Sequence, residues 1–122
     1  MHILARMRVL IPLLLAASPA FAVEPVIENV NVTRTAPETY RFSVTIRHPD
    51  TGWDHYADAW RVLDMNGNEL GIRNLVHPHE TEQPFTRSLD GVKVPQGARQ
   101  VQVQARDLPA GWNAGTTVVD LP

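Results

Sequence analysis

Residues 40–47 read Tyr-Arg-Phe-Ser-Val-Thr-Ile-Arg, with large apolar and polar side chains alternating at every position. Successive side chains of a β-strand point to opposite faces, so the four apolar residues would share one face and the polar residues the other. This stretch predicts a strand with one face in a hydrophobic core. Trp60 and Val62 lie in the next alternating stretch, and we expect Trp60 to join the same core.

The same period of two recurs along the chain, whereas no stretch repeats apolar residues at helical spacing over three turns. Turn signals rich in glycine and proline separate the alternating stretches. The expected strands cover approximately residues 25–34, 40–47, 60–62, 70–75, 85–92, 101–105 and 117–121. About seven short strands in one domain-sized chain predict an all-β fold, a single antiparallel β-sandwich.

The first 22 residues have the pattern of an export signal. Arg6 and Arg8 precede an apolar run from Val9 to Ala17, and a small-residue cleavage site follows at residues 20–22. We expect cleavage after Ala22, which divides the chain into a signal peptide, 1–22, and a sandwich domain, 23–122. The expected protein is exported, either periplasmic or secreted.

The composition of the chain argues against several classes of function. The chain has no cysteine, so it can form neither a disulfide nor a lipid-anchored amino terminus, and we expect no membrane anchor after cleavage. The formal net charge is −2, and losing Arg6 and Arg8 makes it more negative, which argues against nucleic acid as a partner. The chain also lacks a cysteine nucleophile, a glycine-rich phosphate loop and a recognisable serine elbow, so we expect no enzyme activity.

Two stretches resemble known proteins. Residues 89–97, Leu-Asp-Gly-Val-Lys-Val-Pro-Gln-Gly, followed by the alternating residues 101–105, resemble the second half of a fibronectin type III or related immunoglobulin-like domain. That resemblance implies an immunoglobulin-like sandwich over residues 25–122 and carries no activity. The block HPHxxEQPFTR, residues 77–87, resembles a group of small exported bacterial proteins and implies no reaction or ligand. The chain departs from that group at Ala110, where many members place a histidine.

The four histidines of the expected domain gather in two loops. In an antiparallel sandwich with strands in sequence order, successive loops alternate between the two ends. The loops that carry His48 and His55, and then His77 and His79, would therefore share one end with the last long loop. Long loops on a rigid scaffold commonly carry binding residues, so this end is the expected functional surface.

His77 and His79 are the primary candidates for metal binding. Proline pushes the residue before it into an extended conformation, so the two imidazoles of His77-Pro78-His79 would lie on the same side of the backbone. Such a pair suits zinc or copper(II). Further ligands would come from Glu82, His48 and His55. The alternative is a proline-stiffened loop whose histidines bind backbone carbonyls or face solvent.

Aromatic residues suggest a second kind of site at the same end. Trp53, Tyr56 and Trp112 would form an exposed platform, since tryptophan and tyrosine are enriched in interface cores and also stack on sugars. The alternative is that Trp112 closes the end of the core. Two functions follow, namely a binding module for an envelope protein or glycan, and a metal-binding protein centred on the histidine pair.

Overall fold

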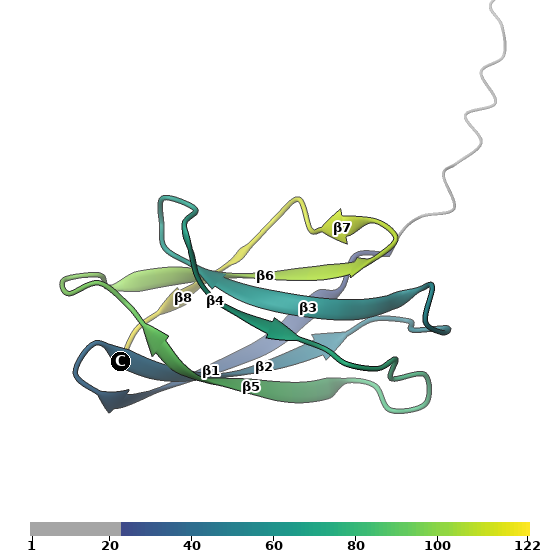
Figure 1. Ribbon diagram of the computed structural model, residues 1–122, viewed down its shortest axis with the longest axis horizontal. Coiled ribbons are helices and arrows are strands. Elements are labelled where there is room, and N and C mark those ends of the chain that lie inside the picture. The colour runs from purple at the N-terminus through teal and green to yellow at the C-terminus, as the bar shows by residue number, and fades with distance from the viewer. Residues whose placement is uncertain (1–22) are drawn as a thin grey trace, which may run out of the picture.

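The computed structural model describes residues 23–122, and the expected signal peptide lies outside the described residues. These residues form only strands and their connections, as Figure 1 shows. The strands are β1 (Val26–Ala36), β2 (Thr39–Arg47), β3 (Tyr56–Leu63), β4 (Glu69–Asn74), β5 (Phe85–Lys93), β6 (Gln100–Leu108), β7 (Gly111–Trp112) and β8 (Thr117–Asp120). Over the described range, no helix is long and apolar enough to cross a membrane.

The strands pair antiparallel in two sheets that lie face to face (Figure 1). The three-stranded sheet has the order β1-β2-β5, and the five-stranded sheet has the order β4-β3-β6-β7, with β8 also pairing with β6. The prediction of an all-β, two-sheet sandwich is confirmed.

The number of strands differs from the expected seven because residues 111–112, predicted to be loop, form the short strand β7. Gly111 has a φ of 90°, which glycine adopts without steric cost, and the chain reverses there. Trp112 then pairs with Arg106 of β6. The polar composition around Gly111 favoured a loop, whereas backbone pairing with β6 continues the sheet by two residues.

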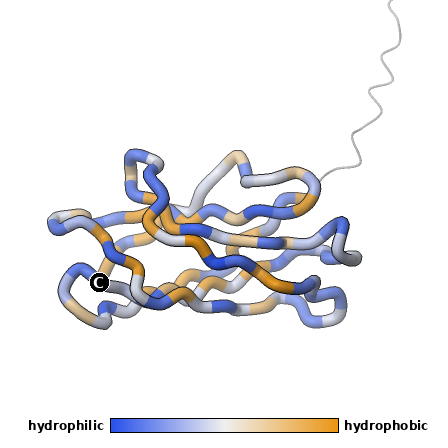
Figure 2. The backbone as a smooth tube through the Cα atoms, viewed as in Figure 1, coloured by the Kyte–Doolittle hydropathy of each residue, from blue (hydrophilic) through white to orange (hydrophobic). Residues whose placement is uncertain are grey.

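The core lies between the sheets, as the alternation along residues 40–47 predicts. Phe42, Val44, Ile46 and Trp60 are fully buried, and Tyr40 is nearly so. Facing residues of β6 complete the cluster, namely Val101, Val103 and Ala105. Apolar and polar residues alternate along the strands in Figure 2, so each sheet turns one face inward and the other to solvent.

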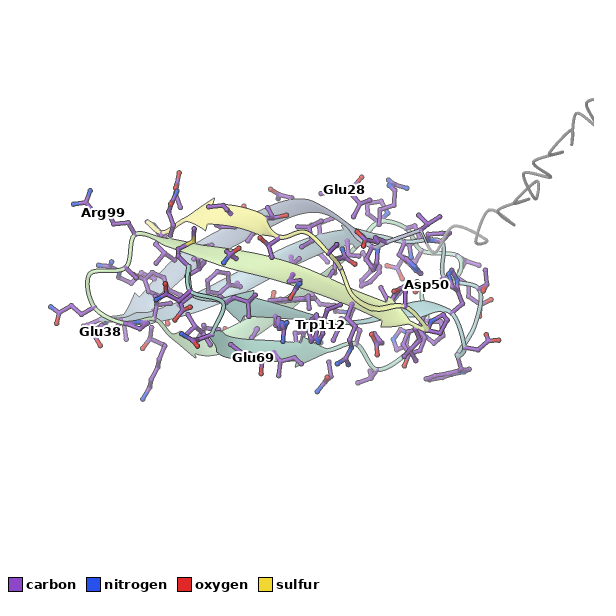
Figure 3. The ribbon with its side chains drawn as sticks, turned by 90° about the horizontal axis from the view of Figure 1, so that it is seen from above. Glu28, Glu38, Asp50, Glu69, Arg99 and Trp112 are labelled. Carbon is purple, nitrogen blue, oxygen red and sulfur yellow. The ribbon has the colours of Figure 1, made fainter. Side chains whose placement is uncertain are left out.

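The two ends of the sandwich differ. The β1–β2, β3–β4 and β5–β6 connections lie at one end, near Glu38 and Arg99 in Figure 3, and Gly67 in the β3–β4 turn has a φ of 87°. The longer β2–β3 and β4–β5 loops, and the β6–β7 turn, lie at the other end, near Asp50 (Figures 1 and 3). We call this second end the histidine end, because it contains His48, His55, His77 and His79.

Candidate functional site at the histidine end

A buried imidazole joins two buried carboxylates at the centre of the histidine end. His48 directly follows β2, and its Nδ1 lies 2.6 Å from Oδ1 of Asp50. Its Nε2 lies 3.2 Å from Oδ2 of Asp107, near the end of β6. All three side chains are almost completely inaccessible to solvent. This chain of contacts therefore ties the β2–β3 loop to the five-stranded sheet.

Asp50 accepts hydrogen bonds from three segments of the chain. Besides the His48 ring, its Oδ1 accepts from the backbone N–H of Ala57 at 3.0 Å. Its Oδ2 accepts from the backbone N–H of His79 at 2.7 Å. A buried carboxylate is costly unless such donors surround it, and here they hold the two long loops against β3.

The HPHxxEQPFTR block makes many of the contacts that pack the β4–β5 loop. Gln83 accepts from the backbone N–H of His48 at 3.0 Å and donates to the carbonyl of His79 at 2.9 Å. The Phe85 ring stacks on His79, with ring centres 3.8 Å apart. The Arg87 guanidinium reaches Nε2 of His79 at 2.9 Å. The loop is therefore held by its own side chains as well as by Asp50.

His79 is placed to stay neutral. Burial lowers the pKa of its imidazole, and the positive charges of Arg87 and His77 lower it further, outweighing the opposite effect of Asp50 and Glu82. Because the arginine can only donate, Nε2 of His79 accepts its hydrogen bond and Nδ1 carries the proton. That Nδ1 faces Oδ2 of Asp50 at 3.9 Å.

We expect the pKa of His79 in the folded protein to lie below its ordinary value of 6.5. The unfolded chain then takes up this proton first as the pH falls, so the contribution to stability is present above pH 6.5 and decreases below it. An NMR titration of the His79 ring, in native and in denatured protein, measures the difference. A native midpoint at or above the denatured one would contradict the assignment.

The predicted His77–His79 pair is brought together but is poorly suited to a metal ion. The ring centres lie 4.5 Å apart. However, Nε2 of His79 already accepts from a cationic guanidinium, and Nδ1 of the exposed His77 lies 3.0 Å from the carbonyl of Pro78. Glu82 is exposed and makes none of the hydrogen bonds found in residues 23–122. The five proposed ligands do not form one shell.

Metal-ligating atoms gather instead around His48. Its ring centre lies 4.8 Å from that of His55, which is partly exposed. Ligand atoms of His48, His55 and Asp107 all lie within 4.8 Å of one another. Asp107 was not among the predicted ligands, because nothing in its local sequence distinguishes it from other strand-end carboxylates.

The aromatic platform contains two of its three predicted members. Trp53 and Tyr56 meet edge to face, with ring centres 5.8 Å apart, and Trp53 is 66% exposed. Trp112, the third predicted member, packs against two arginines. Pairing of β7 with β6 places its ring on the outer face of the five-stranded sheet (Figure 3), where it packs against Arg61 at 3.9 Å and Arg106 at 4.8 Å. It does not close the core.

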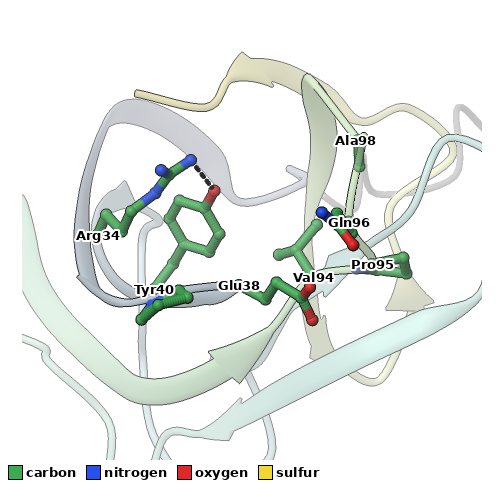
Figure 4. A pocket seen from close by; sticks show the side chains of 9 residues that line it. Arg34, Glu38, Tyr40, Val94, Pro95, Gln96 and Ala98 are labelled. Atoms are coloured by element: carbon green, nitrogen blue, oxygen red, sulfur yellow. Dashed lines mark hydrogen bonds between the residues drawn. The ribbon is translucent and has the colours of Figure 1, made fainter.

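Two hollows lie at the opposite end. The one beside Tyr40 has a volume of about 210 Å³, below the roughly 300–1,000 Å³ of typical small-molecule sites, and the one beside Met65 has a volume of about 430 Å³. Figure 4 shows Arg34 and Tyr40 on one side and the loop of Pro95 and Gln96 on the other. The guanidinium of Arg34 donates to the Tyr40 hydroxyl at 2.8 Å, so the cationic group of this hollow already has a partner.

Comparison with known proteins gives one informative similarity. No protein-family model matches the chain, and no solved structure matches it. A protein of Halomicrobium mukohataei named "Putative lipoprotein" is 40% identical over 92 residues, which make up 75% of this chain and 45% of that protein. The chain thus spans slightly less than half the length of this relative.

Proposed function

We propose that the protein is an exported, non-catalytic binding module of the immunoglobulin-like type that recognises a partner through its histidine end. The proposal rests on the exposure of Trp53. This large aromatic side chain is 66% exposed, beside the buried and hydrogen-bonded side chains of His48, Asp50 and Asp107. Partially polar, flat aromatic residues dominate the binding energy of many interfaces. A rigid framework lowers the entropic cost of binding through the loops that it holds.

Other apolar side chains accompany Trp53 at this end. Val76, in the β4–β5 loop, is 74% exposed, and Leu108, opposite Tyr56 in the β3–β6 ladder, is 37% exposed. Such residues stabilise a complex when their apolar surface is buried against a partner and removed from water. This favours a protein of the cell envelope over a glycan as the partner.

The immunoglobulin-like assignment and the export assignment each have separate support. The three-stranded sheet β1-β2-β5 opposite a sheet containing β4-β3-β6 is compatible with a fibronectin type III arrangement, and Trp60 on β3 is buried between the sheets. The relative from Halomicrobium mukohataei is named a lipoprotein, a class of exported protein, and this supports export of the present chain.

We expect export to remove residues 1–22 and to release a chain that begins at Val23. Intact-mass measurement of the protein recovered outside the cytoplasm tests this, with the full-length mass from a cytoplasmic preparation as the control. Recovery of the uncleaved mass in the membrane fraction would contradict both cleavage and release.

We expect Trp53→Ala to weaken partner binding by about 30-fold or more, the effect of losing a hot-spot residue worth about 2 kcal/mol. A photoreactive amino acid at position 56 would capture the partner in cells, and unlabelled wild-type protein and variants would then compete for the same product. Met65→Ala is the matched control, since Met65 is 49% exposed at the opposite end. Equal competition by Trp53→Ala and wild type would contradict the role assigned to Trp53.

A further inference from the structure

The contacts of His48 have the form of a metal-ligand histidine with its supporting carboxylate. Asp50 lies 2.6 Å from Nδ1 and accepts a hydrogen bond from the N–H there, which leaves the lone pair of Nε2 directed at Asp107. Metal-ligating histidines commonly donate their other ring N–H to a carboxylate in this way. A lone pair facing a carboxylate oxygen at 3.2 Å is repulsive unless a positively charged species lies between or beside them.

Asp107 has an unsatisfied oxygen in the same place. The residue is 1% exposed, and its Oδ1 is buried without a hydrogen-bond partner among residues 23–122. Its other oxygen makes the 3.2 Å contact with His48, longer than the roughly 2.7–2.9 Å of an imidazolium–carboxylate hydrogen bond. A buried carboxylate with so few donors is costly unless a cation binds it.

The charges around the cluster also favour a bound cation. Asp50 and Asp107 are both buried, and across residues 23–122 their salt-bridge partners are histidines and no lysine or arginine. A proton on His48 would neutralise only one of the two negative charges. A divalent ion bound by His48 and Asp107 would neutralise both.

We propose that His48, His55 and Asp107 form a binding site for a divalent transition-metal ion of the zinc class. Two imidazoles and one carboxylate are a suitable ligand set for such an ion, with a fourth position open on the side of the partly exposed His55. Ligand atoms around one zinc ion lie about 3.3 Å apart. The His48–Asp107 contact already has nearly this length, and rotation of His55 brings the third atom in from within 4.8 Å. The site uses neither Trp53 nor Val76, so zinc binding can be tested separately from binding of a partner.

Zinc binding to chelator-treated protein, measured by calorimetry, tests the site. We expect one zinc ion per chain in the wild type, and an affinity reduced about 100-fold or more in His55→Ala, beyond the 10- to 100-fold effect of losing a supporting residue. His77→Ala is the matched control, an exposed histidine at the same end, and should bind zinc like the wild type. Zinc should also raise the thermal midpoint of the wild type and of His77→Ala, but not of His55→Ala.

Asp107→Asn provides a second variant that keeps the side-chain shape and removes the charge. Cobalt(II) should give the strong visible absorption of a tetrahedral site in the wild type, and a weak octahedral spectrum in His55→Ala and Asp107→Asn. Absence of zinc binding in the wild type would overturn the proposal. Undiminished binding in His55→Ala would also overturn it, and so would loss of binding in His77→Ala alone, which would assign the metal to the His77–His79 pair.

Discussion

Trp60→Ala is expected to lower the free energy of unfolding by about 3–5 kcal/mol, the cost of removing a large buried aromatic side chain. Trp60 is fully buried and belongs to the cluster that joins the two sheets. The chain has no disulfide to limit the loss, and a domain of this size has only about 5–15 kcal/mol in total. Much of the protein should therefore be unfolded at moderate denaturant concentrations.

Chemical denaturation of the variant measures this loss, with two companion variants as controls. Trp53→Ala removes the same kind of side chain from an exposed position and should change stability by about 0.5 kcal/mol or less. Trp60→Phe should cost less than Trp60→Ala, because it leaves a smaller cavity and removes an indole N–H that is buried without a partner in the described part of the chain. Equal losses in Trp60→Ala and Trp53→Ala would show that the core does not depend on Trp60.

Asp50→Ala is expected to cost about 3–5 kcal/mol, as when one member of a buried charged pair is removed. The substitution takes away the acceptor for the His48 ring and for the backbone N–H groups of Ala57 and His79. Each of these donors is then buried without a partner. Hydrogen exchange should accelerate most at Ala57 and His79, since their amide protons lose their hydrogen bonds directly.

The same measurement on Asp50→Asn and Asp54→Asn gives the controls. The amide side chain introduced by Asp50→Asn keeps one oxygen that can accept from a backbone N–H, so this variant should be less destabilised than Asp50→Ala. Asp54 is an exposed carboxylate in the same loop, and its replacement should leave both the stability and the exchange rates nearly unchanged. Exchange at Ala57 and His79 as slow in Asp50→Ala as in the wild type would contradict the role assigned to Asp50.

Much of the fold follows from local patterns. The alternation along residues 40–47 predicted both the strand and its buried face, because a strand exposes alternate side chains to opposite environments whatever its partners are. The short strand β7 and the position of Trp112 were missed for the opposite reason. They depend on pairing with Arg106 of β6, which the composition of a glycine-containing loop does not reveal.

At the histidine end, too, the sequence predicted some features and missed others. Loop alternation predicted that the four histidines would share one end, and the contacts of His48, Asp50 and His79 confirm that the two histidine-bearing loops meet. The block at residues 77–87 directed attention to His77 and His79, whereas Gln83 and Arg87 of the same block make the contacts that hold the loop. The sequence does not reveal these contacts, because they depend on which residues lie beside Gln83 and Arg87 in the folded chain.

The sequence by itself thus determined that the chain forms a two-sheet β-sandwich, which residues make its core, and that its histidines lie at one end. All three depend on the period of side chains along each strand and on the order of the strands. Only the tertiary structure decided which polar groups are buried together. His48 and Asp107 are 59 positions apart, and they meet because the two sheets pack face to face and bring the ends of β2 and β6 into contact.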